Sequence, residues 1–149
     1  MDNTDKRILN LLRNDARMPN VALARELNMA PSAVLERVRK LEESGVIQGY
    51  VTRIDSRKLN RNMQILIDLD TDENIGESSV GLELAKMPEI VEILETCGER
   101  YYRLKVVVRD TDELADLMYR IGKIPLVRKS YSHLILNTIK NDLSSEIID

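Results

Sequence analysis

Hydrophobic residues between positions 29 and 47 recur at the spacing of an amphipathic helix. Val34, Val38 and Leu41 stand at i, i+4 and i+7, which places them on one narrow face. Pro31 suits the first helical position, where a missing N–H costs no hydrogen bond, and Gly45 suits a left-handed residue just beyond the last turn. The pattern therefore predicts a helix that begins at Pro31, ends before Gly45 and has a polar second face.

Two shorter helices are predicted before this one. Ile8, Leu11 and Leu12 share a face of the first helix, and the apolar spacing of the second follows Asn20, a residue type favoured at helix N-caps. The second and third helices are separated by "NMA", in which Asn28 can adopt the left-handed conformation of a tight turn. Three helices with this short connection predict a helix-turn-helix domain.

After the third helix the pattern changes to that of β-strands. The stretch "GVIQGYVTRID" at 45–55 predicts an extended β segment, and "SRKLNRN" predicts a polar linker. Beyond the linker, the apolar patterns predict strands at 63–70, 90–98, 101–110 and 127–140 and helices at 81–88 and 113–122. Thr111 or Asp112 is suited to cap the second of these helices.

The predicted order βαββαβ is typical of the ferredoxin-like sandwich, so the fold class is α+β. The predicted organisation is a helix-turn-helix domain with winged-helix-like character at 1–50, a β segment and linker at 51–62, a ferredoxin-like domain at 63–140 and an acidic tail at 141–149. Helices on one face of a four-stranded sheet leave its other face uncovered. We therefore expect a dimer or a higher even-numbered assembly, such as an octamer.

Charge is distributed unevenly between the two predicted domains. Residues 1–62 hold 12 Lys or Arg against 8 Asp or Glu, whereas residues 63–149 hold 10 against 17, so the two parts carry +4 and −7. This asymmetry indicates that the N-terminal part meets a polyanion and that the C-terminal part does not.

Composition excludes several other classes of protein. One cysteine and one histidine cannot form a disulfide framework or a usual zinc site, so we expect no metal and no other cofactor. Cys97 is expected to be a small buried side chain, with redox sensing as the alternative. No apolar run approaches the roughly 18 to 20 residues of a membrane helix, and "MDNTDKR" lacks the apolar core of a signal peptide, so we expect a cytoplasmic protein.

Four ordered blocks resemble the Lrp/AsnC family of feast/famine transcription regulators over essentially the whole chain. The blocks are "DKRILNLLRNDAR", "LARELNMAPSAVLERVRKLEESGVIQGY", "GERYYRLKVVVRDTDEL" and "VRKSYSHLILNTIK". The resemblance implies an N-terminal domain that binds double-stranded DNA and a C-terminal domain that dimerises and assembles further. It also implies a small effector, commonly an amino acid, that binds between subunits.

The polar face of the third helix is the expected DNA-reading surface, because a recognition helix docks on its own domain by an apolar face and reads the major groove with the other. Arg37 is suited to a bidentate contact with guanine, Arg39 and Lys40 to phosphates, and Ser32 to a phosphate at the helix N-terminus. Glu36 is either a specificity element or a brake on affinity. The predicted DNA-binding residues are Ser32, Ala33, Glu36, Arg37, Arg39 and Lys40.

Two positions depart from the family pattern. Ala30 stands before Pro31 where the family often has Ser, so the third helix lacks a side-chain N-cap, a loss usually worth about 0.5 to 2 kcal/mol. At the turn between the middle strands, the family typically has Gly-Asp-X-Asp and binds its effector there. Here Tyr101 replaces the second acid, which puts ordinary amino-acid binding in doubt.

The effector turn retains groups that can bind a charged ligand. Glu99 can receive an ammonium group, and Arg100 can receive a carboxylate. His133 lies on the last strand, near a region that borders the effector cavity in the family, and the alternative for this residue is a structural role. The alternative for the turn is a hairpin whose charged side chains are solvated and bind no effector. The predicted effector-binding residues are Gly98, Glu99, Arg100, Tyr101 and His133.

Two further classes of function remain open at this stage. Sirohaem decarboxylases have a similar two-domain build, and holding and protonating a polycarboxylate tetrapyrrole requires basic and histidine groups. The single histidine and the acidic C-terminal domain argue against this alternative. The other alternative is an assembly protein that has lost DNA binding. We expect no catalytic residues and favour a regulator of transcription.

Overall fold

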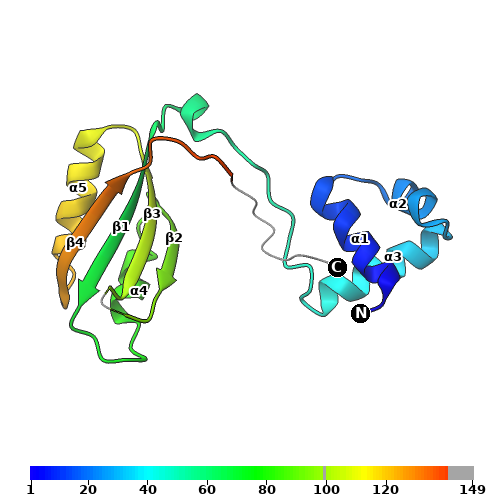
Figure 1. Ribbon diagram of the computed structural model, residues 1–149, viewed down its shortest axis with the longest axis horizontal. Helices are drawn as coiled ribbons and strands as arrows, with labels where there is room; N and C mark the ends of the chain where they lie inside the picture. The colour runs from blue at the N-terminus through cyan, green and yellow to red at the C-terminus, as the bar shows by residue number, and fades with distance from the viewer. Residues whose placement is uncertain (99, 141–149) are drawn as a thin grey trace. The chain divides into compact units, whose positions relative to one another are not determined.

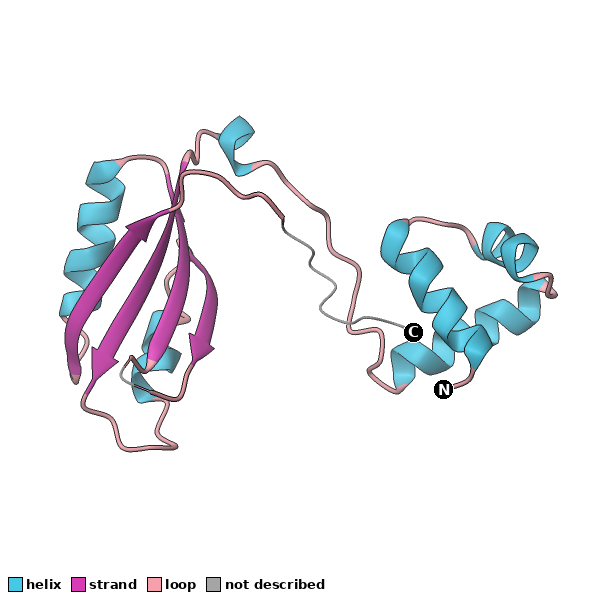
Figure 2. Ribbon diagram, viewed as in Figure 1, coloured by secondary structure: helices cyan, strands magenta, loops and turns pink. Residues whose placement is uncertain are grey.

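The computed structural model describes residues 1–98 and 100–140 and divides into two compact units. The first unit runs from Met1 to Arg53, and the second runs from Ile54 to Ile139. In the first unit the described secondary structure is helical, whereas the second combines helices with a sheet (Figure 2). No helix in the described ranges is long and apolar enough to cross a membrane.

Three helices form the first unit: α1 (Asn3–Asn14), α2 (Asn20–Leu27) and α3 (Pro31–Glu43). Their apolar faces meet in one core, as the predicted spacing requires. Its buried members are Ile8, Leu12, Leu23, Ala24, Leu27, Val34, Val38 and Leu41. The predicted helix-turn-helix architecture is therefore confirmed, including the apolar face of α3.

The ends of α2 and α3 have clear chemical causes. Asn28 follows α2 with φ of 54°, the left-handed conformation expected of it. Ala30 is the N-cap of α3 and makes no side-chain hydrogen bond. After α3, Gly45 turns the chain with φ of 74°, and the Ile47 N–H donates to the Leu41 carbonyl at 3.0 Å. The glycine is needed there because other residues rarely adopt this conformation.

Two expectations for this unit are wrong. Asn20 is the first residue of α2 rather than its N-cap; Pro19 takes the cap position and accepts the N–H of Leu23 through its carbonyl. The segment 45–55 is not a strand, because within the described chain it has no ladder partner. Tyr50 instead donates its hydroxyl hydrogen to Glu42 at 2.8 Å, which ties this segment to α3.

The second unit is a four-stranded antiparallel sheet covered on one face by two helices (Figure 1). A short 3-10 helix, η1 (Ser56–Leu59), precedes it. The remaining elements are β1 (Met63–Thr71), α4 (Ser79–Leu84), β2 (Ile90–Glu95), β3 (Tyr102–Val108), α5 (Thr111–Gly122) and β4 (Val127–Leu134). The strand order is β2-β3-β1-β4, which confirms the predicted ferredoxin-like α+β fold.

Alternation along the central strands separates a core face from an uncovered face. Ile65, Ile67 and Leu69 of β1 are at most 2% exposed and pack with Leu117 and Ile121 of α5. The residues between them point to the other face, because successive side chains of a strand alternate. That face carries opposite charges side by side, since Asp68 stands opposite Arg103 and Glu92 stands opposite Lys105.

Several element ends differ from the predicted ones. The helix expected at 81–88 starts at Ser79, because the Glu73 carboxylate accepts the Val80 N–H at 2.9 Å and secures its first turn. Asp110, rather than Thr111 or Asp112, caps α5 by accepting the Glu113 N–H at 2.9 Å. Strand β4 ends at Leu134, and the predicted tail at 141–149 lies outside the described residues.

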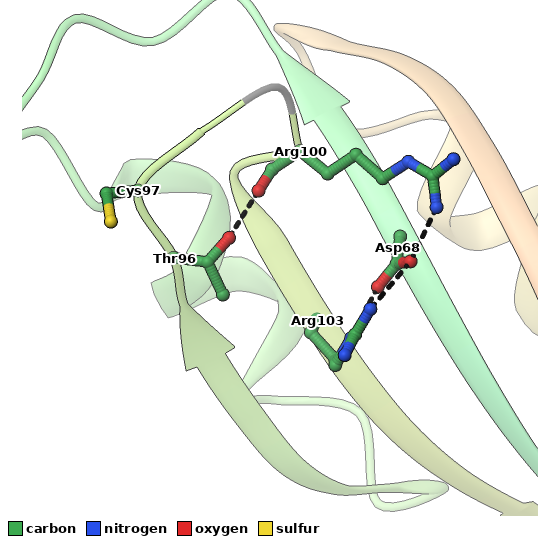
Figure 3. A pocket seen from close by; sticks show the side chains of 5 residues that line it. All are labelled: Asp68, Thr96, Cys97, Arg100 and Arg103. Atoms are coloured by element: carbon green, nitrogen blue, oxygen red, sulfur yellow. Dashed lines mark hydrogen bonds and ion pairs between the residues drawn. The ribbon is translucent and has the colours of Figure 1, made fainter.

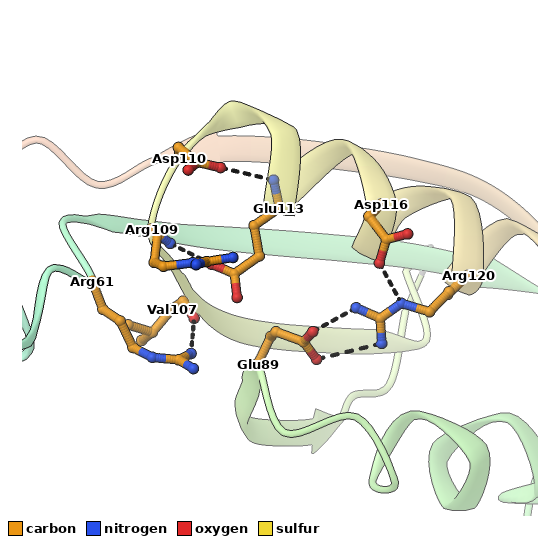
Figure 4. A network of polar contacts seen from close by, with 8 residues as sticks. All are labelled: Arg61, Glu89, Val107, Arg109, Asp110, Glu113, Asp116 and Arg120. Atoms are coloured by element: carbon orange, nitrogen blue, oxygen red, sulfur yellow. Dashed lines mark hydrogen bonds and ion pairs between the residues drawn. The ribbon is translucent and has the colours of Figure 1, made fainter.

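A polar network fixes the end of the sheet where the chain enters β1 (Figure 4). Arg61 donates to the Val107 carbonyl at 3.2 Å. Arg120 of α5 binds Glu89, which precedes β2, at 2.5 Å and Asp116 at 2.8 Å. Arg61 thus ties the linker to β3, and Arg120 ties α5 to the residue before β2.

Candidate DNA-binding helix and effector pocket

The polar face of α3 is exposed to solvent. The side chains of Glu36, Arg39 and Lys40 are 50%, 60% and 70% exposed, and Ser32 and Ala33 are exposed at the start of the helix. Val34, Val38 and Leu41 are buried on the opposite side. The sequence therefore builds a helix that is anchored by one face and presents charged and small side chains on the other.

Glu36 lies between the two nearby cations of this face. Its carboxylate is 3.6 Å from Arg39 Nη2 and 3.6 Å from Lys40 Nζ. Exposed pairs at these helical spacings contribute little to stability and exchange readily with solvent. All three side chains are consequently available to a partner, and Glu36 moderates the positive charge that it would meet.

Arg37 does not join this exposed group, in contrast to the expectation. Its Nη1 atom is 2.7 Å from Asp2 and 2.7 Å from Asp5, both at the N-terminus of α1. The hydrogen bonds from Asp5 and Asp2 raise the pKa of Arg37, and the pKa of Asp2 is lowered by its bond to the Asp5 N–H and by Arg37. The guanidinium is thus engaged inside its own domain.

The same two aspartates also cap α1. The Asp2 side chain accepts the Asp5 N–H, and the Asp5 side chain accepts the Asp2 N–H, each at 2.9 Å, which is a capping box. Arg37 therefore joins the start of α1 to the middle of α3. This contact spans 32 residues of sequence and had no signal in helical spacing.

The second candidate site lies at the turn between the end of β2 and the start of β3. A pocket of about 480 Å³ is lined by Asp68, Thr96, Cys97, Arg100 and Arg103 (Figure 3). Thr96 donates its hydroxyl hydrogen to the Arg100 carbonyl and so closes the turn between the two strands. Gly98 in this turn has φ of 131°, which suits glycine.

Asp68 organises the pocket. Its side chain is 3% exposed although it lies on the face without helices. It accepts hydrogen bonds from Arg103 Nε at 2.7 Å, from Arg103 Nη2 at 3.1 Å and from Arg100 Nη1 at 2.8 Å. The hydrogen bonds from Arg103, assisted by Arg100, outweigh burial and lower the pKa of Asp68 to about 2.

The predicted effector residues are only partly brought together. Arg100 lines the pocket, and its guanidinium also stacks 4.2 Å above the ring of Tyr131. Tyr101 points elsewhere and donates to Glu95 at 2.8 Å. His133 is exposed on β4 opposite Leu66 and does not line the pocket. Glu99 lies outside the described residues.

The sequence did not single out Asp68, Thr96 and Arg103. The available signal was the alternation of β1, since a charged residue between Ile67 and Leu69 must face away from the core. Pairing it with Arg103 required the register of β1 against β3. Cys97 is exposed rather than buried, because it belongs to the turn and not to the strand.

The fold and these two sites define a two-domain transcription regulator, with a DNA-binding helix-turn-helix and a ligand-binding domain. Residues 1–48 match the winged helix-turn-helix DNA-binding family, and residues 63–144 match the Lrp/AsnC ligand binding domain. The chain belongs to the Lrp/AsnC family of transcriptional regulators, as the sequence resemblance predicted.

Individual relatives agree with this assignment. The chain is 35% identical to the HTH-type transcriptional regulator FL11 of Pyrococcus horikoshii, over 94% of this chain and 92% of the relative. It is 34% identical to the regulator LrpA of the same organism, over 94% and 99%. The crystal structure of the Mycobacterium tuberculosis leucine response regulatory protein LrpA superposes with a TM-score of 0.85 at 29% identity, covering all of both chains.

The contact of Arg37 with Asp5 makes a prediction about stability. Arg37→Ala and Asp5→Ala should each lower the melting temperature of the protein, and the double variant should lose less than the sum, because each change removes the same ion pair. Circular dichroism melting of the four proteins measures this coupling. Arg39 and Glu43, an exposed pair on the same helix, provide the control and should show almost none. Full additivity at Arg37 and Asp5 would contradict the assignment.

The lowered pKa of Asp68 makes a prediction about acid stability. Ionised Asp68 contributes stability above its ordinary pKa of 3.8, and this contribution is lost as the pH falls toward about 2. The difference in unfolding free energy between wild type and Asp68→Asn should therefore be largest at about pH 5 to 7 and shrink below about pH 4. Urea denaturation at several pH values tests this. Asp72→Asn, which breaks an exposed pair with Arg128, should have little effect; a constant Asp68→Asn difference would refute the account.

Proposed function

We propose that this chain regulates transcription by binding duplex DNA through α3 and by sensing a small molecule through its C-terminal domain. The observation that carries the proposal is the exposed polar face of α3, a helix whose opposite face packs in the three-helix core. The same chain contains a ligand-binding domain with a pocket. A helix with this division of faces fits the major groove. We place the protein in the cytoplasm because its DNA partner is there.

The exposed side chains of α3 take different roles in this proposal. Ala33 and Glu36 face base edges, where a carboxylate accepts a hydrogen bond from cytosine N4. Arg39 and Lys40 bind phosphates, and Ser32 lies where the helix N-terminus meets a phosphate. We propose Arg37 as a positioning residue, since its guanidinium already binds Asp2 and Asp5.

We also propose that the protein acts as a dimer or as a higher even-numbered assembly. The face of the sheet without helices carries Leu66 and Val107 beside its ion pairs, and Val107 is only 9% exposed. A second sheet would cover this face, and paired recognition helices would read two half-sites of a palindrome.

The regulator is favoured over the other two classes of function. The matched family consists of regulators, and His133, the sole histidine, is an exposed strand residue that is not among the residues lining the pocket. A decarboxylase would therefore have no histidine in the described pocket lining to act as its proton donor, and we propose no enzymatic activity. An assembly protein without DNA binding would not need the exposed basic side chains of Arg39 and Lys40.

Selection of genomic fragments by the full chain tests the proposal directly. Sheared genomic DNA is incubated with the purified protein, and the bound fragments are sequenced with and without candidate metabolites. We expect enrichment of a recurring motif, and a metabolite that changes the enrichment identifies the effector. Recovery of DNA in proportion to its abundance, at every salt concentration, would contradict sequence-specific binding.

Three variants of α3 separate base reading from phosphate binding and positioning. Glu36→Ala should change the preferred sequence, since base contacts carry discrimination, whereas Lys40→Ala should weaken binding to all sequences about equally and lower the salt slope by about 1. Arg37→Ala should keep the preferred sequence at a reduced melting temperature. Fluorescence anisotropy with the selected motif and its single-base variants measures all three. If Arg37→Ala alone abolished site preference while remaining folded, Arg37 would be a base-reading residue instead.

Assembly makes a separate prediction. Light scattering of the purified protein at micromolar concentration should give the mass of two chains or of a larger even number, because one uncovered sheet face requires a partner. Lys105→Glu reverses a charge on that face and should favour smaller species, whereas Lys123→Glu on the exposed end of α5 should not. A monomeric wild-type protein would contradict the proposal.

A further inference from the structure

We infer that the pocket beside Asp68 binds a small organic anion, preferably a dicarboxylate, through Arg100 and Arg103. This inference rests on the proposed sensing function and names the chemical class of its ligand. It departs from a neutral amino acid as the effector, because the described pocket residues offer cationic donors in excess and no carboxylate that is still unpaired.

Charge is the first observation. Two guanidinium groups face one carboxylate, so Asp68, Arg100 and Arg103 together carry one net positive charge. The side chains of Arg100 and Arg103 are 43% and 53% exposed, whereas that of Asp68 is 3% exposed. The positive groups are therefore partly exposed to solvent, whereas the negative group is almost fully covered.

The count of hydrogen-bond donors leads to the same ligand class. Each guanidinium has five N–H donors in a fixed planar fork. Asp68 takes up Arg100 Nη1 and Arg103 Nε and Nη2. Within the described residues, Arg100 Nε and Nη2 and Arg103 Nη1 have no acceptor. A carboxylate satisfies such donors two at a time, so the pocket has capacity for an anion.

The donors are also held in place before a ligand arrives. Asp68 lies on the central strand β1 and fixes both guanidinium groups, and the Tyr131 ring stacks against Arg100 at 4.2 Å. Fixing long side chains in advance reduces the entropy lost on binding. This distinguishes the pair from mobile surface arginines, which bind anions weakly.

Among the described residues that line the pocket, an ammonium group finds no unpaired carboxylate. Both oxygens of Asp68 are already engaged with arginine, and the other described lining residues, Thr96 and Cys97, have no carboxylate. A neutral amino acid would bring its ammonium next to two guanidinium groups. A dicarboxylate brings a second negative charge instead, and about 480 Å³ is sufficient for a molecule of that size.

Thermal shift and titration calorimetry on the full-length protein test the inference. The probes are succinate, 2-oxoglutarate, leucine and methionine, with sodium sulfate at matched ionic strength. We expect the two dicarboxylates to raise the melting temperature, following RT ln(1 + [L]/Kd), and the two neutral amino acids to leave it unchanged. A larger response to leucine or methionine overturns the inference. An equal response to sulfate also overturns it, by showing an adventitious ion only.

Variants of the pocket identify the groups responsible. Arg103→Gln should weaken dicarboxylate binding about tenfold or more, since it removes a charged hydrogen-bond donor. Arg103→Lys keeps the charge beside Asp68 and should retain part of the affinity, which separates loss of binding from loss of folding. Glu99→Gln should not reduce dicarboxylate affinity, whereas an effector held by its ammonium group would be lost. Lys123→Gln, at the exposed end of α5 and outside the pocket lining, is the control and should bind as wild type.

Measuring DNA binding without any ligand shows whether the anion site or the proposed regulatory function has failed. If the dicarboxylates fail to bind but the protein still selects a DNA motif, this inference is wrong and the DNA-binding function stands. If the protein binds no DNA preferentially while the dicarboxylates bind as expected, the proposed regulatory function fails and the anion site stands.

Discussion

The buried carboxylate of Asp68 is the constraint around which the C-terminal domain organises its candidate site. A carboxylate 3% exposed is stable only when it is paired and hydrogen-bonded, and Arg100 and Arg103 supply three hydrogen bonds to it. Arg103 belongs to β3 and Arg100 to the turn before it, so this requirement fixes the turn against β1. The pocket is therefore a consequence of satisfying one buried charge on the central strand.

In the N-terminal domain, a pair of carboxylates likewise holds an arginine in place. Asp2 and Asp5 cap α1 and also bind Arg37 of α3, so α3 is held at its middle as well as by its apolar face. The exposed residues of α3 then include five of the predicted DNA contacts, Ser32, Ala33, Glu36, Arg39 and Lys40. In both domains, ion pairs between arginine and aspartate fix the arginine side chains. These pairs thereby determine which polar groups are free to contact DNA or a ligand.

The fold was predictable where periodicity carried the information, and the sites were less so. The 3.6-residue spacing of Val34, Val38 and Leu41 and the alternation of Ile65, Ile67 and Leu69 each determined which face is buried. The roles of Arg37 and Asp68 depend on contacts across 32 or more residues, which local spacing cannot reveal. The segment 45–55 has strand composition, but a strand requires a partner, and in the described chain it has none.

The central claim is that one chain links DNA binding by α3 to ligand binding beside Asp68, and thermodynamic linkage tests it most directly. The affinity for the selected DNA motif is measured with and without a saturating dicarboxylate, and the affinity for the dicarboxylate with and without DNA. The account predicts that each partner changes the affinity of the other by the same factor, typically about 5- to 150-fold. Two affinities that are each measurable and wholly independent of one another would contradict it.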